Sequence, residues 1–399
     1  MNQTHVQPRW HVLLVLSLLM GFASISTDLY LPAIPAMAES LGANAGMMEF
    51  TISGYLIGFS LGQLVWGPVS DAHGRRPAIA IGLVMFMIGS AGCALSDNAM
   101  TIIGWRVVQA LGACASVALS RAMVRDLYQG NHAAQMLSTL ITIMAIAPLI
   151  GPLVGGQIIG LAGWRAIFWV LVLVGAITFV ALFSIPETHP KERRNQEHII
   201  YAMSRYWHLL QHKRLLGYLC VGGFYYAGMF AYVAGTPFVY ISYYHVAPQS
   251  YGWLFALGIV GIMISNQINS RLVRKIGYDR LLLYGTLLAT LFSLFTALAC
   301  QTGWGGLWGL VVPLVLFVSA TGLIVANAIT GALADFPQRS GAISALTGAF
   351  QYGSGILGSG LVGFFANETP QPMGWVIGLS GIGCLVSMVL VRKTHGTTG

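Results

Sequence analysis

Charged residues are scarce in this sequence. Only 8% of its 399 residues are Asp, Glu, Lys or Arg, whereas 56% are hydrophobic. A soluble protein carries roughly 25% charged residues, so this share is too small to cover a soluble domain. The hydrophobic segments also lack the alternating pattern of membrane-spanning strands. The composition therefore predicts an all-α polytopic membrane protein.

Residue patterns that carry enzyme chemistry are also missing. The five cysteines are widely separated, without the spacing of a metal site, and their odd number predicts no disulfide framework. The histidines lie in predicted loops or near the termini, so we expect no histidine proton relay. The Gly-rich stretches lie inside predicted spans and lack the strand and the Lys that phosphate binding requires. We therefore expect no enzyme, no metal, no cofactor and no direct use of ATP.

Hydrophobic segments long enough to cross a membrane, about 20 residues each, occur twelve times. The first exceeds the length of a signal peptide and is interpreted as an uncleaved helix. In the second, Gly54, Gly58 and Gly62 share one face, which predicts close helix packing. The predicted spans lie near residues 12–36, 47–66, 78–96, 101–124, 136–160, 165–185, 214–240, 251–271, 281–300, 305–334, 341–366 and 373–391.

The distribution of Lys and Arg predicts the orientation. Nearly all of them fall on the side of the two termini, while the opposite side has Arg165. Such asymmetry places both termini in the cytoplasm and accounts for the net charge of +8 without a nucleic-acid partner.

The longest charged stretch divides the spans six and six. We therefore predict an N-terminal half (1–185), a linker (186–213) and a C-terminal half (214–399), with a surface amphipathic helix near 201–210. Gly74 and Gly277 occupy matching places after the second and eighth spans, which suggests duplication of one six-helix unit.

Asp28 is a lone carboxylate in the first span, where a charge costs roughly 2.5–3.5 kcal/mol. At 1.5 Å per residue it lies about 24 Å from the inner edge, and roughly 6 Å below the outer edge of a ~30 Å core. Arg106 lies at a similar depth, roughly 8 Å from that edge. We expect each charge to lower the cost of the other. Three interpretations remain open: a hydrated interface residue, a static salt bridge and a proton site.

A short loop after the second span carries an ordered set of glycines and charges. Gly74 permits a tight turn, Asp71 can accept from backbone N–H groups or an arginine, and two arginines can hold the loop at the headgroups. The spacing resembles the G-x-x-x-D-x-x-G-R-R/K signature of the major facilitator superfamily. The stretch reads Gly67-Pro-Val-Ser-Asp71-Ala-His-Gly74-Arg75-Arg76-Pro77.

That resemblance implies a conformational latch between the two halves, formed by Gly67, Asp71, Gly74, Arg75, Arg76 and Arg125. In the superfamily the aspartate pairs with an arginine at the inner end of the fourth span. Arg121 and Arg125 are the candidates here, and Arg125 is the better placed.

Two further segments resemble motifs of the same superfamily. Pro148 and Gly151-Pro152-Leu-Val-Gly155-Gly156 resemble the G-P-x-x-G-G motif of proton-coupled exporters, and Gly151 and Gly155 share a helix face that another helix can approach. We expect this bend to pack against the other half and seal the path. Arg106-Val-Val-Gln109-Ala110-Leu-Gly112 resembles R-x-x-Q-G-x-G, with Ala110 in place of a glycine. It implies that Arg106 joins Asp28 in proton coupling.

The resemblance narrows to the bicyclomycin- and chloramphenicol-resistance (Bcr/CflA) subfamily of drug–proton antiporters. It rests on Asp28-Leu-Tyr-Leu-Pro-Ala-Ile-Pro35, on Gly235-Thr-Pro-Phe-Val-Tyr240 and on Ala328-Ile-Thr-Gly-Ala-Leu-Ala-Asp335-Phe-Pro337 with Gly341. It implies the major facilitator fold, with two pseudo-two-fold-related halves, in a monomeric transporter of the bacterial inner membrane. Small antibacterials such as bicyclomycin, phenicols or sulfonamides would be the cargo, and the proton gradient would supply the energy.

Aromatic and polar residues at mid-depth are the candidates for binding the drug, because rings can stack on a ligand and polar groups can orient it. Two other functions remain open: a proton-coupled symporter or facilitator of a small metabolite, and a receptor or scaffold without transport. The predicted substrate-binding residues are Tyr30, Ser53, Tyr55, Gln109, Tyr225, Tyr226, Phe230, Tyr232, Asn266, Asn327, Gln351 and Tyr352.

Overall fold

The computed structural model describes residues 10–128, 130–190, 192, 194, 207, 209–334, 336 and 339–392. The predicted surface helix near 201–210, and the motif residues Asp335 and Pro337, lie largely or wholly outside this part of the chain. Within it, every regular element is a helix, which confirms the predicted fold class. Nine helices or joined helix pairs among the described residues are long and apolar enough to cross a membrane.

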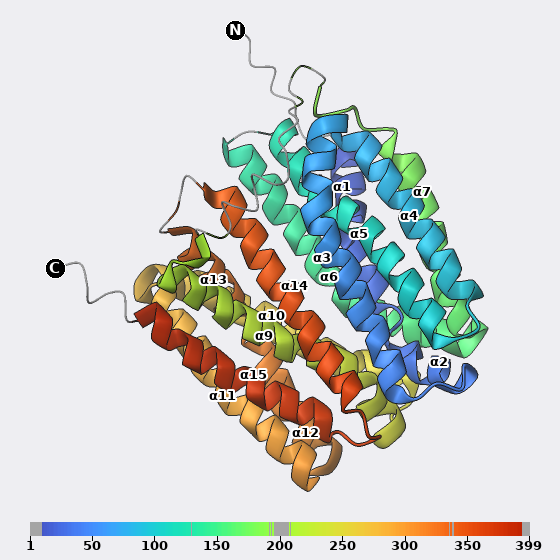
Figure 1. Ribbon diagram of the computed structural model, residues 1–399, viewed down its shortest axis with the longest axis vertical. Helices are drawn as coiled ribbons and strands as arrows, with labels where there is room; N and C mark the ends of the chain where they lie inside the picture. Colours follow the sequence, from blue (N-terminus) through green and yellow to red (C-terminus); the bar gives the residue numbers. More distant parts are fainter. Residues whose placement is uncertain are drawn as a thin grey trace, which may run out of the picture.

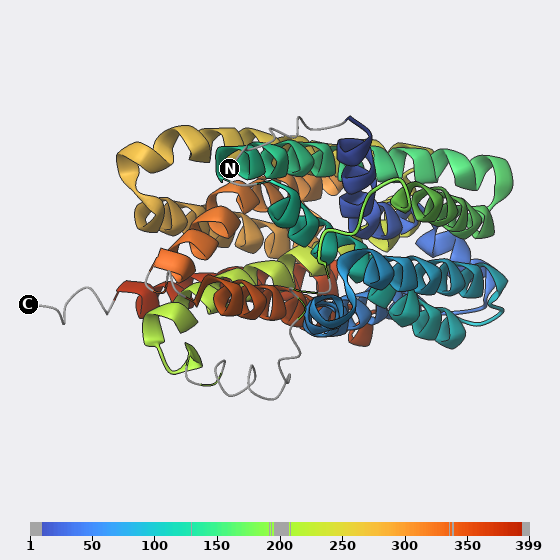
Figure 2. The same ribbon diagram turned by 90° about the horizontal axis from the view of Figure 1, so that it is seen from above.

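Each of the twelve predicted spans falls on helices. The first half contains α1 (Trp10–Asp28), α3 (Ala45–His73), α4 (Arg75–Leu95), α5 (Ala99–Leu127), α6 (Gly130–Ala162) and α7 (Trp164–Leu182). The second contains α9 (Lys213–Pro237), α10 (Pro248–Ile276), α11 (Tyr278–Thr302), the pair α12 (Gly306–Ser319) and α13 (Thr321–Ala334), α14 (Ser340–Phe364) and α15 (Gln371–Arg392). Figures 1 and 2 show the blue-to-green half beside the yellow-to-red half.

Small residues bring the helices of the first half close together. A Cβ added at Gly58 would meet the backbone carbonyl of Val107, and one added at Gly82 would meet the Cβ of Ala115. Helices α3 and α4 can therefore both lie directly on α5, as glycine-rich faces allow in membranes. The predicted packing role of the glycine face of α3 is confirmed.

The first span is interrupted just after its carboxylate. Helix α1 ends at Asp28, and the chain continues through the 3₁₀ turn η1 (Leu31–Ala33) into α2 (Ile34–Ser40). Pro32 and Pro35 stand in the first turns of these two short elements. Proline lacks the N–H that continues a helix, so the break follows directly from the Leu-Pro-Ala-Ile-Pro sequence. Asp28 consequently lies at a helix end.

The two halves meet mainly at one end of the bundle, which we call the α2 end because it carries α2. Helix α3 crosses α14 there, where a Cβ on Gly46 would strike the carbonyl oxygen of Gly363. Ser53 and Ser359 join the same two helices through hydroxyl oxygens 2.8 Å apart. On the other side α6 lies along α10 (Figure 2).

Gly74 and Gly277 have equivalent positions in the two halves. Gly74 ends α3 with φ 104° and Gly277 ends α10 with φ 85°. Both values lie in the left-handed region that favours glycine. The matching turns agree with the predicted duplication, and both lie at the end of the bundle opposite α2.

Candidate functional site

A cavity of about 370 Å³ lies between the two halves. Such a volume is suited to a small organic molecule, and its lining is mostly apolar and aromatic with a few polar groups, as is usual for ligand sites. Asp28 supplies the carboxylate of this cavity, beside Thr27. Helices α1, α3, α6, α9, α10 and α14, together with Thr321 of α13, contribute the walls.

Aromatic rings from both halves cluster in this central cavity. The ring of Tyr352 on α14 lies 4.9 Å from that of Phe59 on α3, and 6.1 Å and 6.3 Å from those of Tyr226 and Phe230 on α9. These separations between ring centres are those of interacting aromatic pairs. A flat ligand could therefore stack on rings that both halves provide.

Asp28 is 7% exposed and faces this cavity from the end of α1. Thr27 Oγ1 donates a hydrogen bond of 3.2 Å to its Oδ1. Among the described residues no lysine or arginine nitrogen lies within salt-bridge distance of Asp28. The expected close pairing with Arg106 is therefore wrong, and so is the interpretation as a static salt bridge.

Arg106 is held by other groups. Its side chain is fully buried between the rings of Tyr30 and Tyr55, with the guanidinium carbon 4.1 Å and 4.3 Å from the ring centres. Nη1 donates to the carbonyl oxygen of Ser26 at 2.9 Å and to the side-chain oxygen of Gln109. Nε and Nη2 have no hydrogen-bond partner in the described part of the chain. Two flanking aromatic faces satisfy the cation in place of a carboxylate.

The glycine–proline segment of α6 contacts both Asp28 and the other half. A Cβ on Gly151 would approach the Cβ of Asp28 to 3.0 Å, and one on Gly155 would strike the carbonyl oxygen of Leu29. On the opposite face, a Cβ on Gly156 would come within 2.7 Å of the carbonyl oxygen of Pro248 in α10. The expected packing against the other half is therefore found at Gly156. Gly151 and Gly155 instead pack against Asp28 and Leu29, at the end of α1.

The predicted substrate residues divide into two groups. Five of them line the central cavity: Tyr55, Tyr225, Tyr226, Phe230 and Tyr352. The other seven lie elsewhere: Tyr30 and Gln109 beside Arg106, Ser53 against Ser359, Tyr232 stacked on Phe255, Asn327 bonded to Asn269, Gln351 near Gly222, and Asn266 on an exposed face of α10. The residue type alone, polar or aromatic, does not distinguish side chains that line the cavity from side chains that hold neighbouring helices together.

Several apolar residues that line the central cavity were not predicted from the sequence. Met229, Phe255 and Ile259 line the cavity, and Phe59 contributes a ring to its aromatic cluster. Their side chains are indistinguishable in type from those that face lipid or the helix core. Their spacing from predicted residues is the one available signal, since Met229 follows Tyr226 by three positions and so shares its helix face.

The charged loop between α3 and α4 forms a network inside the first half. Arg75 pairs with Asp71 at 2.6 Å and with Asp126 of α5 at 3.1 Å. No salt bridge joins Asp71 to Arg121 or Arg125 among the described residues, so the expected pairing is wrong. Helix α5 contacts the loop through Asp126 instead. These contacts join α3 to α5. The predicted latch between the halves stays a prediction.

The carboxylate of Glu187 binds the backbone where the same loop enters α4. Its carboxylate oxygens accept from the backbone N–H groups of Arg75 and Arg76 at 2.9 Å and 3.1 Å. Because these N–H groups open α4, the carboxylate satisfies donors that the helix leaves free and complements the positive end of the helix dipole. Gly74 is in close contact with this carboxylate: a Cβ added at Gly74 would approach Glu187 Oε2 to 2.7 Å.

Replacing Gly74 by Ala is expected to destabilise the protein by about 1–3 kcal/mol, the cost of a non-glycine residue in a sparsely populated backbone conformation. The added Cβ would also displace Glu187. Thermal unfolding in detergent measures the effect. Gly67→Ala is the matched control, because its Cβ would have no neighbour within 4 Å. Equal unfolding temperatures for the two variants would refute the role assigned to Gly74.

Two helical halves around a small-molecule cavity define a membrane transporter, and the sequence comparisons agree. Residues 16–241 match the Major Facilitator Superfamily, and the chain belongs to this family. It is 34% identical to the uncharacterized MFS-type transporter YdgK of Bacillus subtilis, over 96% of this chain and 97% of that protein.

Two other relatives carry the names of resistance proteins, as the sequence motifs predicted. The chain is 30% identical to the bicyclomycin resistance protein homolog of Haemophilus influenzae, over 95% of this chain and 94% of the relative. It is also 30% identical to the chloramphenicol resistance protein of Pseudomonas aeruginosa, over 84% and 79% of the two chains.

A solved structure with the same fold is the partially occluded inward open conformation of the xylose transporter XylE from E. coli. It matches with a TM-score of 0.72 over 98% of this chain and 99% of the other. The sequence identity is 16%, so this likeness concerns the fold alone.

Proposed function

We propose that the protein is a drug/proton antiporter that exports small antibacterials across the bacterial inner membrane by alternating access. The observation that carries this proposal is Asp28, a buried carboxylate that faces the central cavity and has no Lys or Arg within salt-bridge distance among the described residues. Burying an unpaired carboxylate is costly, and two events remove the cost: binding a proton, or opening to water. A group of this kind can exchange protons as the cavity changes access.

Helix α6 offers a route by which movement of the halves could act on Asp28. Gly151 and Gly155 hold one face of α6 against α1 at Asp28, and Gly156 holds the other face against α10. A rocking motion that separates α6 from α10 would shift the packing around the carboxylate. Proton occupancy and conformation would then bias one another, which is what coupling requires.

The orientation belongs to the same proposal. Lysines and arginines concentrate at the end of the bundle opposite α2, so we place that end, with both termini, in the cytoplasm. The tight contacts at the α2 end then correspond to an inward-facing state. Residues 1–185 and 214–399 act as the moving halves, joined by the linker 186–213, within a monomer.

Drug accumulation in cells tests the direction of transport. A host without its own efflux pumps, expressing this protein, should accumulate less chloramphenicol or bicyclomycin than the same host with an empty vector. Dissipating the proton gradient should restore accumulation. A rise in energy-dependent accumulation would instead establish the competing proton symport of a small molecule.

A disulfide across the α2 end should stop transport. Ser53 and Ser359 lie on opposite halves, with their hydroxyl oxygens 2.8 Å apart, so Ser53→Cys with Ser359→Cys can form a bridge once oxidised. Because the bridge holds that end closed, oxidation should block export and a reductant should restore it. The two single variants are the controls. Undiminished export by the fully oxidised double variant would contradict alternating access at this position.

A further inference from the structure

A second cavity lies at the α2 end of the bundle, and a buried glutamate forms part of its lining. This seam pocket, of about 430 Å³, lies between α2 and α3 of one half and the π-helical turn η3 (Phe238–Tyr243), the 366–369 loop and α15 of the other. Glu49 of α3 lines it and is 4% exposed. Glu49 Oε2 is buried and has no hydrogen-bond partner among the described residues.

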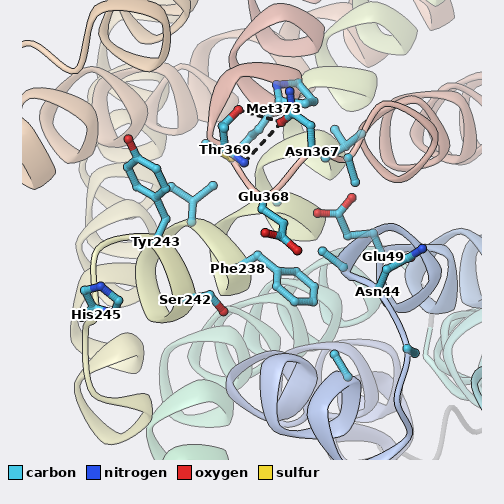
Figure 3. A pocket seen from close by; sticks show the side chains of 18 residues that line it. Asn44, Glu49, Phe238, Ser242, Tyr243, His245, Asn367, Glu368, Thr369 and Met373 are labelled. Carbon is cyan, nitrogen blue, oxygen red and sulfur yellow. Dashed lines mark hydrogen bonds between the residues drawn. The ribbon is translucent and has the colours of Figure 1, made fainter.

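A second carboxylate faces Glu49 across the pocket. Figure 3 shows the carboxylates of Glu49 and Glu368 pointing toward one another, from α3 and from the loop before α15. His245 is the titratable base of the lining, and none of the described lining residues is Lys or Arg. Two carboxylates that share one site do not both stay ionised unless a positive charge lies between them; otherwise one of them takes up a proton. A bound cation would let both carboxylates of the seam pocket stay ionised and would give Glu49 Oε2 a hydrogen-bond partner.

The walls favour an organic cation over a metal ion. No group of three or more metal-ligating His, Cys, Asp or Glu residues occurs in the described part of the chain. The lining combines Phe238, Val239 and Met373 with the ring of Tyr243. Apolar and aromatic surfaces of this kind hold the body of an organic molecule, and aromatic faces also attract its ammonium group.

We propose that the seam pocket binds a primary organic ammonium ion, whose N–H groups donate to Glu49 and Glu368 while its apolar body lies against Phe238 and Met373. Because the ligand would touch both halves, it would stabilise the contact between them at the α2 end. The site is separate from the central cavity, and it stands whether or not Asp28 couples protons.

Monodansylcadaverine is a suitable probe, because it joins a primary ammonium to a fluorescent apolar body. Binding is measured by fluorescence anisotropy on the full chain in detergent, in the Asp28→Asn background so that the central cavity lacks its carboxylate. We expect saturable binding, and Glu49→Gln should weaken it roughly 10- to 100-fold, the value of losing a hydrogen bond to a charged group.

Two matched variants and one matched ligand complete the test. Glu39→Gln removes an exposed acid of α2 at the same end and should leave binding unchanged. Glu368→Gln alters an exposed loop, so it should weaken binding even if Glu49→Gln fails to fold. N-acetylated monodansylcadaverine, which has no charge on that nitrogen, should not compete. Equal binding by the Glu368→Gln and Glu39→Gln variants, or effective competition by the acetylated compound, would overturn the proposal.

Discussion

Replacing Asp28 by Asn is expected to abolish uphill drug export while leaving the fold intact. Asparagine keeps the size of the side chain and its hydrogen bond with Thr27, but it cannot exchange a proton. Asp28 is buried in the central cavity and lacks a cationic partner among the described residues, so its neutral replacement should not cost stability. Export against a gradient and thermal unfolding are the two measurements.

Asp97→Asn is the matched control for this substitution. Asp97 is an aspartate whose side chain is 92% exposed, in a weak contact of 3.5 Å with Arg165, and such surface pairs contribute little. Export by the Asp97→Asn variant should equal that of the unaltered protein. If the Asp28→Asn variant also exported drug uphill with normal proton coupling, the proton site would lie elsewhere.

Replacing Arg106 by Met is expected to stop transport without lowering stability. The guanidinium is fully buried, has no carboxylate partner in the described residues, and leaves two of its nitrogens without a hydrogen bond. Methionine removes the cost of burying this unpaired charge, which offsets the loss of the hydrogen bonds that Arg106 donates to Ser26 and Gln109. If the buried charge of Arg106 does not stabilise the fold, we expect that it is needed for transport.

Thermal unfolding and drug export, measured on the same sample, distinguish a structural role of Arg106 from a role in transport. Arg165→Met provides the comparison, since Arg165 is a partly exposed cation at the α2 end. A marked fall in the unfolding temperature of the Arg106→Met variant would show that the stack of Arg106 between Tyr30 and Tyr55 is a structural device. Retained export would remove Arg106 from the coupling mechanism.

The sequence predicted the features that depend on local chemistry. The twelve spans follow from runs of apolar residues, the turn at Gly74 from glycine and flanking charges, and the packing of α3 on α5 from glycines at helical spacing. Each of these needs only neighbours along the chain, or a face of one helix. The family followed from ordered motifs, and the match over residues 16–241 agrees.

Contacts that depend on the rotation of one helix against another could not be predicted in the same way. Depth alone put Asp28 and Arg106 at one level, but it could not say that Tyr30 and Tyr55 would enclose the guanidinium. Likewise, Gly151 was expected to face the other half and instead lies against Asp28. Glu49 escaped notice because an acid near the start of a span resembles an interface residue.

Substrate-induced proton movement tests the account most directly. Everted membrane vesicles that contain the protein are acidified inside by respiration, and a pH-sensitive dye reports the pH of the lumen. Adding chloramphenicol should make the lumen more alkaline, because each exported molecule enters as protons leave, and the Asp28→Asn variant should show no change. If a drug that the unaltered protein demonstrably transports leaves the luminal pH unchanged, proton-coupled antiport is refuted.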